Sequence, residues 1–135
     1  MKKVLDSHAL MVFLEKEPGY EKVQSLLVAA VEKDQPLLMS VINWAEIHYI
    51  VLRELGEQKA REIDRVIMAM PIELVEVDLS LARQAARFKA FKKMACGPAV
   101  TRGFAAALAK ISKAQLVTGD KEFKAVEDEI NILWI

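Results

Sequence analysis

The sequence predicts an α/β protein built on a mostly parallel, five-stranded sheet, and three observations support this. Short apolar runs alternate with longer segments of helical periodicity, which is the pattern of βαβ units. No linker, internal repeat or low-complexity tract divides the chain. The 135 residues, 53% of them hydrophobic, are enough to bury a core of ordinary size without disulfides. We therefore expect a single domain over residues 1–135.

Five segments predict the strands: residues 3–6, 37–40, 72–77, 115–118 and 130–134. The third and fifth segments contain Glu73, Glu76 and Asn131, which indicates edge strands with one wetter side. The other three are more uniformly apolar, which favours central positions in the sheet.

Helices are expected in the gaps between these strands. Asp78 is a plausible N-cap for a helix that runs to about residue 94. Phe104, Leu108 and Ile111 form a second apolar stripe at helical spacing. Gly56 is expected to divide residues 42–70 into two helices.

The charges are balanced in number but not in position. The chain has 19 basic and 19 acidic residues, yet residues 79–113 contain no Asp or Glu and eight Lys or Arg. Such a block could attract a phosphodiester backbone. The alternative is a solvated helix face that keeps the protein soluble.

The sequence favours a cytoplasmic protein. Its single cysteine, Cys96, cannot form an internal disulfide, which suits a reducing compartment. No apolar run approaches the roughly 20 residues needed to cross a bilayer. The amino terminus passes from Lys2 and Lys3 into a strand without a cleavage pattern. We expect no membrane association.

Glu46 lies in a segment that is apolar on nearly every side of a helix. An ionised carboxylate buried there is costly, so it should be protonated, paired with a base or bound to a cation. Arg53 shares its helix face at a spacing of seven residues and could be an ordinary structural partner.

Asp6 and Asp120 each follow a predicted strand, at the edge where open α/β sheets place their binding crevice. Each also has a structural explanation: an N-cap for Asp6, and a turn or cap after Gly119 for Asp120. Three acids in one crevice would need a cation, and carboxylate oxygens favour Mg²⁺ or Mn²⁺ over zinc. Such a site suits phosphodiester hydrolysis.

Five motifs carry a resemblance to a known family: VLDSHALMVFLE at residues 4–15, SVINWAEIHYIVLRE at 40–54, PIELVEVD at 71–78, FAAALAK at 104–110 and LVTGDKEF at 116–123. In order and spacing they resemble the PIN domain family, and specifically the VapC-type ribonuclease toxins of VapBC toxin–antitoxin systems. The resemblance implies a three-layer α/β/α sandwich with sheet order 3-2-1-4-5.

The resemblance also assigns roles to residues. It implies Mg²⁺-dependent endonucleolytic cleavage of RNA, with Asp6, Glu46 and Asp120 as the metal-site and catalytic acids. The polar supporting positions it implies are Ser7, Asn43 and Thr118. It further implies a homodimer and a cognate VapB-type antitoxin that inserts into the active-site groove.

One position departs from the family pattern. Aligned on Phe104, the place of a further metal-site acid is taken by Arg102, and residues 94–103 around it differ from the family as well. A cation there opposes a divalent ion, so nuclease activity could be impaired. The alternative is a catalytically inactive PIN domain that binds RNA or an antitoxin. An unrelated flavodoxin-like binding domain is a third possibility, but no Gly-rich phosphate loop supports it.

Overall fold

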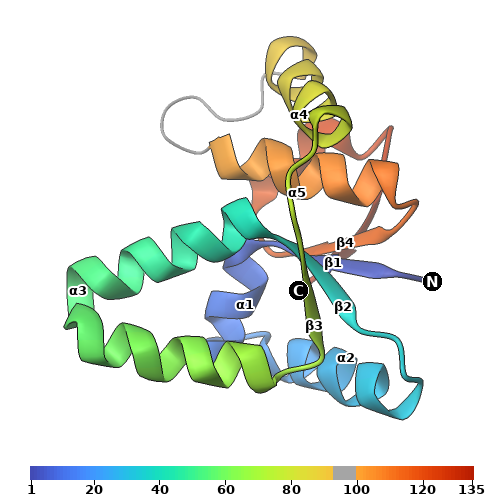
Figure 1. Ribbon diagram of the computed structural model, residues 1–135. Coiled ribbons are helices and arrows are strands. Elements are labelled where there is room, and N and C mark those ends of the chain that lie inside the picture. Colours follow the sequence, from blue (N-terminus) through green and yellow to red (C-terminus); the bar gives the residue numbers. More distant parts are fainter. Residues whose placement is uncertain (93–99) are drawn as a thin grey trace.

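The computed structural model describes residues 1–92 and 100–135, and its ribbon is shown in Figure 1. In chain order its elements are β1 (Lys3–Leu5), α1 (Ser7–Leu14), α2 (Tyr20–Glu32), β2 (Leu37–Ser40), α3 (Val41–Ala69), β3 (Ile72–Val75), α4 (Leu79–Phe91), α5 (Val100–Ile111), β4 (Gln115–Thr118), the 3-10 helix η1 (Lys121–Val126) and β5 (Asn131–Trp134). The alternation of strands and helices expected from the sequence is confirmed.

The five strands form one sheet in the order β3-β2-β1-β4-β5, and every neighbouring pair is parallel. This confirms the predicted fold class and strand order, with β3 and β5 at the edges. The chain builds outward from β1 to β3, then returns to place β4 on the other side of β1. The boundary between β1 and β4 is therefore the topological switch point of the sheet.

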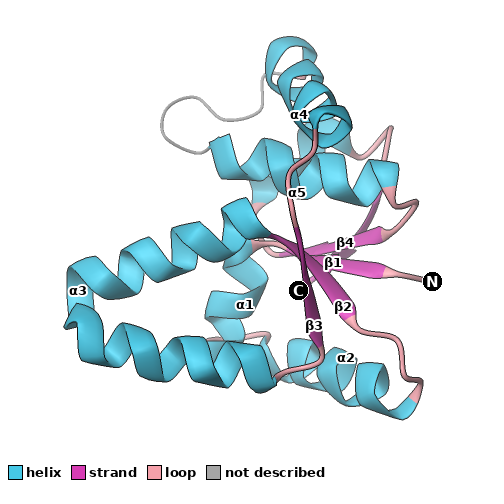
Figure 2. Ribbon diagram, viewed as in Figure 1, coloured by secondary structure: helices cyan, strands magenta, loops and turns pink. Residues whose placement is uncertain are grey.

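Alternate residues of the strands face opposite layers, as the two-residue period of a strand requires. Val4, Leu38 and Leu116 pack in a core with α4, α5 and η1. Their neighbours Leu5, Leu37 and Val117 pack in a second core with α1, α2 and α3. Figure 2 shows the same layers, with α4 and α5 above the sheet and α1 and α2 below it. The result is the expected three-layer α/β/α sandwich.

Three predicted strand boundaries differ from the structure by one or two residues, and α3 begins and ends one residue before the predicted 42–70. The first strand ends at Leu5 because Asp6 already caps α1, and the third ends at Val75. The fifth strand begins at Asn131. Helix α4 ends at Phe91 with Lys92 as its C-cap, which is earlier than the predicted end near residue 94. Cys96 lies outside the described residues.

The long helix α3 is a helical hairpin. Gly56 has φ 86° and ψ 174°, a conformation open almost only to glycine, and the two halves of α3 meet there. This confirms the predicted division, and Figure 1 shows both halves projecting to one side of the sheet. The first half starts at the carboxyl end of β2, where Ser40 Oγ accepts a 3.1 Å hydrogen bond from Ile42 N.

Within the part of the chain that the structure describes, no helix has both the length and the apolar character needed to span a bilayer.

Candidate active site

A small pocket opens at the carboxyl ends of the central strands. It is lined by Asp6, Ser7, His8, Asn43, Glu46, Thr101, Arg102, Asp120 and Phe123. Asp6 follows β1 and Asp120 follows β4, so the pocket lies at the switch point of the sheet. The three predicted acids therefore line one pocket, together with Ser7 and Asn43 of the predicted supporting set.

Asp6 uses its two oxygens for different purposes. Oδ1 accepts a 2.7 Å bond from Ala9 N and caps α1, as the structural explanation expected. Oδ2 accepts a 2.6 Å bond from Thr118 Oγ1 on the neighbouring strand. Burial raises the pKa of this carboxyl to about 6, and the two hydrogen bonds oppose that rise. Asp6 is thus both a helix cap and a pocket carboxylate.

The two carboxylate oxygens of Asp120 also accept hydrogen bonds from two different groups. Oδ1 accepts a 3.0 Å bond from Glu122 N at the start of η1, which is the expected cap. Oδ2 accepts a 2.6 Å bond from Arg102 Nε. Its backbone N–H donates to Thr118 Oγ1 at 3.0 Å, so the Thr118 hydroxyl joins the two aspartates. Thr118, the third residue of the predicted supporting set, therefore lies between the two aspartates.

Glu46, one turn inside α3, reaches the pocket from the other side. Its Oε2 accepts a 2.9 Å bond from Thr101 Oγ1 at the start of α5. The alternative partner suggested by the sequence is wrong, because Arg53 instead contacts Glu54 and Tyr49, each at 3.2 Å. Glu46 is partly buried and faces the pocket rather than a surface base.

Ser7 and Asn43 tie the beginnings of α1, α3 and α5 together. Asn43 Nδ2 donates to Ser7 Oγ at 3.1 Å and to the Thr101 carbonyl at 3.2 Å, and Ser7 Oγ donates to the Asn43 carbonyl at 3.1 Å. Both side chains are buried. Among the described residues Asn43 Oδ1 has no donor, so one buried acceptor beside the pocket is uncommitted.

Arg102, the departure from the family pattern, points into this pocket and pairs with Asp120. The positive charge of Arg102 balances part of the negative charge of the three acids. As the side chains stand, no three His, Cys, Asp or Glu residues within 1–92 and 100–135 are close enough together to enclose a metal ion. A cation would therefore have to rearrange Arg102 or the hydroxyl groups that now contact the acids.

Part of the basic segment of residues 79–113 forms ion pairs with acidic residues of this chain. Lys92 pairs with Asp128 at 2.7 Å and Glu129 at 3.2 Å, and Lys110 also pairs with Glu129. The exposed remainder includes Arg83, Arg87, Lys89 and Lys113. The exposure of these side chains fits either interpretation of the segment, and Arg102 is the one Lys or Arg among its described residues that lines the pocket.

Thr101 was not singled out from the sequence, although it contacts Glu46 and Asn43. The available signal was its position directly before Arg102, the residue that departs from the family pattern. His8, at the start of α1, also lines the pocket. A Cβ on Gly119 would lie 2.7 Å from its Cε1, so the ring lies directly over that glycine.

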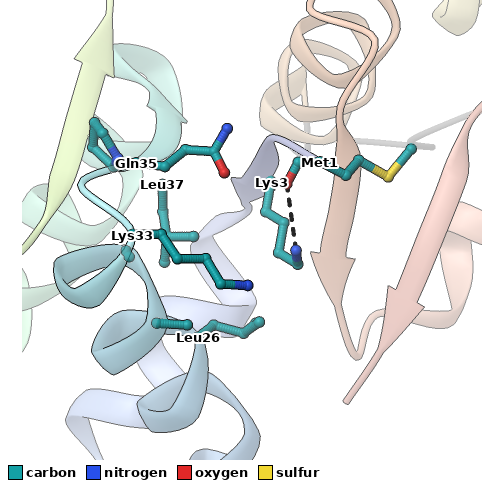
Figure 3. Close-up of a pocket in the computed structure, with 9 residues that line it drawn as sticks. Met1, Lys3, Leu26, Lys33, Gln35 and Leu37 are labelled. Atoms are coloured by element: carbon teal, nitrogen blue, oxygen red, sulfur yellow. Dashed lines mark hydrogen bonds between the residues drawn. The ribbon is translucent and has the colours of Figure 1, made fainter.

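A second pocket lies at the opposite ends of the strands and is shown in Figure 3. Its lining includes Lys3, Leu26, Lys33, Gln35 and Leu37, and the dashed line marks the bond from Lys3 Nζ to the Met1 carbonyl. None of the described residues that line it has a carboxylate side chain, and it lies at the amino ends of β1 and β2. Open α/β sheets bind ligands at the other edge, so this pocket is the weaker candidate.

The fold and the pocket define a class: parallel α/β domains with an acidic site at the switch point. The profile of the PIN domain family matches residues 3–129. The VapC ribonuclease Mb0640 of Mycobacterium bovis is 31% identical over 124 residues, which cover 90% of this chain and 92% of that protein. The chain therefore belongs to the PIN domain family, in its VapC group.

Solved structures agree on the fold. The DNA-bound VapBC complex from Salmonella typhimurium contains a chain that superposes with a TM-score of 0.78 at 18% identity, covering 98% of this chain and 97% of that one. A chain of VapBC2 from Rickettsia felis, bound to a promoter DNA fragment, gives a TM-score of 0.77 at 19% identity, with coverage of 100% and 99%.

Proposed function

We propose that this chain is a VapC-type toxin that cleaves RNA phosphodiester bonds endonucleolytically. The observation that carries the proposal is the convergence of Asp6, Glu46 and Asp120 from three separate elements on one pocket. Acids brought together in this way suit metal-assisted hydrolysis of a phosphodiester. The ribonuclease name of the similar mycobacterial protein supports RNA as the substrate.

The donor set fits Mg²⁺ or Mn²⁺, because carboxylate oxygens are the ligands these hard cations prefer. Asp6, Glu46 and Asp120 would hold the ion. When bound, it would neutralise the acids and make a water molecule a better nucleophile. Each acid has one oxygen bonded to a side-chain donor, from Thr118, Thr101 or Arg102. An oxygen has a second lone pair, so these contacts restrict the ligands without using them up.

The residues around the three acids hold the elements that carry these acids in fixed positions. Thr118 holds Asp6 beside Asp120, and Asn43 and Ser7 keep the starts of three helices together. These contacts keep the elements that carry the acids in place, so the rearrangement for a cation is confined to Arg102 and the hydroxyl groups, and such positioning lowers a barrier.

We also propose a cognate VapB-type antitoxin as the protein partner and a homodimer as the assembly. Two solved relatives with the same fold are VapBC complexes, which supports the first. The homodimer rests on the family resemblance.

A second candidate function is a catalytically inactive PIN domain that binds RNA or an antitoxin. The ion pair of Arg102 with Asp120 favours it, since that pair occupies one of the three acids. The two candidates differ in whether the native chain cleaves RNA.

The test is cleavage of a panel of structured RNAs by the purified protein in Mg²⁺, in Mn²⁺ and in EDTA. The native chain is compared with Glu46→Ala and Arg102→Asp. Cleavage that needs both the metal and Glu46 supports the ribonuclease. An inactive native chain with an active Arg102→Asp variant supports the second candidate. If none of the proteins cleaves RNA in any metal, the enzyme proposal is wrong.

A further inference from the structure

We propose that Arg102 is a substrate-binding residue that contacts a phosphodiester group of the RNA directly, while Asp120 holds its guanidinium in place. This inference rests on the proposed function, because it takes RNA as the ligand. It gives the residue that departs from the family pattern a positive role.

The guanidinium of Arg102 is held at one edge only. Its Nε donates to Asp120 Oδ2 at 2.6 Å, and 29% of the side chain is exposed. Among the described residues, neither of its terminal amino groups has a hydrogen-bond acceptor. Those two groups carry four of the five N–H donors. The planar fork of an arginine matches two oxygens of a phosphate.

Asp120 is a fixed support for this side chain. Its Oδ1 is bonded to Glu122 N and its own backbone N–H to Thr118 Oγ1, each at 3.0 Å. Thr118 is fully buried and also contacts Asp6. An arginine anchored to such a carboxylate loses less conformational freedom when it binds a ligand than one on the open surface.

The charge of the metal-free pocket also favours a cation that faces the substrate. Asp6, Glu46 and Asp120 repel a phosphodiester, and Arg102 is the single Lys or Arg among the described residues that line the pocket. Its place in the first turn of α5 does not serve the helix, because a cation is unfavourable at a helix amino terminus. The amino terminus of a helix attracts an anion, in the same sense as Arg102.

The competing explanation is that Arg102 only neutralises Asp120. The counter-ion explanation and the phosphate-contact proposal predict different RNA affinities for a variant that loses both charges. If Arg102 is only a counter-ion, Arg102→Ala combined with Asp120→Ala restores the pocket's net charge and the RNA affinity. If Arg102 contacts phosphate, the double variant still binds RNA more weakly than the native chain.

The experiment measures binding of a fluorescein-labelled single-stranded RNA by fluorescence anisotropy, in EDTA so that no cleavage occurs, from 50 to about 300 mM salt. Arg102→Ala should weaken binding about tenfold and reduce the slope of log affinity against log salt by about 0.7, the value for one phosphate contact to a single strand. The RNA affinity of Arg102→Lys should lie between those of the native chain and Arg102→Ala. Lysine keeps the positive charge but lacks the planar, forked donor groups of arginine.

Arg61→Ala is the matched control, since Arg61 contacts Glu57 on the surface of α3 and does not line the pocket. It should bind within about twofold of the native chain. Circular dichroism establishes that each variant is folded. Native affinity and salt slope in Arg102→Ala, or in the double variant, would overturn the inference and leave the ribonuclease proposal standing. Failure of the native chain to bind the RNA would overturn this inference, whereas the ribonuclease proposal is judged separately by the cleavage assay in metal.

Discussion

Thr118 Oγ1 donates a 2.6 Å hydrogen bond to Asp6 Oδ2, and both side chains are buried where β1 and β4 end side by side. The same hydroxyl accepts from the backbone N–H of Asp120. One threonine therefore sets the spacing of two of the three acids. Its position follows from the parallel pairing of Leu5 with Val117, which brings the next residues of both strands to the same edge.

Thr118→Val should destabilise the fold by about 1–3 kcal/mol at pH 7.5, because it leaves the buried Asp6 oxygen without its donor. Valine keeps the shape of threonine, so packing is nearly unchanged. Thr118→Ser retains the hydroxyl, so it should destabilise the fold much less than Thr118→Val. Urea denaturation of the three proteins measures the difference. Equal midpoints and slopes for the valine variant and the native chain would show that the bond contributes nothing to stability.

The raised pKa of Asp6 predicts a specific pH dependence of stability. The folded value of about 6 lies above the unfolded value of 3.8, so the native state binds the proton more tightly. This group's favourable contribution is fully present below about pH 3.8 and is lost as the pH rises through about 6, on the order of 3 kcal/mol.

In metal-free buffer Asp6→Asn should therefore be more stable than the native chain at pH 8, by about 1–2 kcal/mol once weaker hydrogen bonds are allowed for. The gain should shrink as the pH falls from 6 to 4. Comparing the two proteins isolates Asp6 from Asp128 and Glu129, whose pKa values are lowered by their ion pairs to Lys92 and Lys110 and act in the opposite sense. A difference that does not change with pH would contradict the assignment.

The fold could be predicted from the sequence because its signals are local. The apolar runs at 37–40 and 115–118 are strands with those bounds, and Gly56 breaks α3 where expected. The strand order came from the resemblance, because no local pattern states which strands are neighbours.

The site could be predicted only in part. The sequence offered a cap or a pocket for Asp6 and Asp120 as alternatives, whereas each carboxylate has two oxygens and does both. The contact of Glu46 with Thr101 and that of Arg102 with Asp120 join residues 55 and 18 positions apart. Such contacts depend on how α5 packs against α3 and against the start of η1, which the periodicity of a single helix does not define.

The break in α3 predicts that Gly56→Ala destabilises the protein by about 1–3 kcal/mol. The cause is backbone strain alone, since apart from the adjoining residues no described part of the chain has an atom within 4 Å of the Cβ that alanine would add. Asparagine, which tolerates the left-handed helical region, should not help at ψ 174°. Urea denaturation tests both variants, and a Gly56→Ala protein as stable as the native one would mean that the hairpin bends differently in solution.

A divalent ion held by the three acids should stabilise the folded chain whether or not RNA is cleaved. At a free Mn²⁺ concentration ten times the dissociation constant the gain is about 1.4 kcal/mol, which raises the melting temperature by a few degrees for a chain of this size. Glu46→Ala removes one ligand and should lose most of that shift. Glu62→Ala, an exposed acid that contacts Lys59 outside the pocket, should keep it. Identical melting of the native chain in Mn²⁺ and in EDTA would count against an ion at these carboxylates, and Arg102 would then be the cation that balances them.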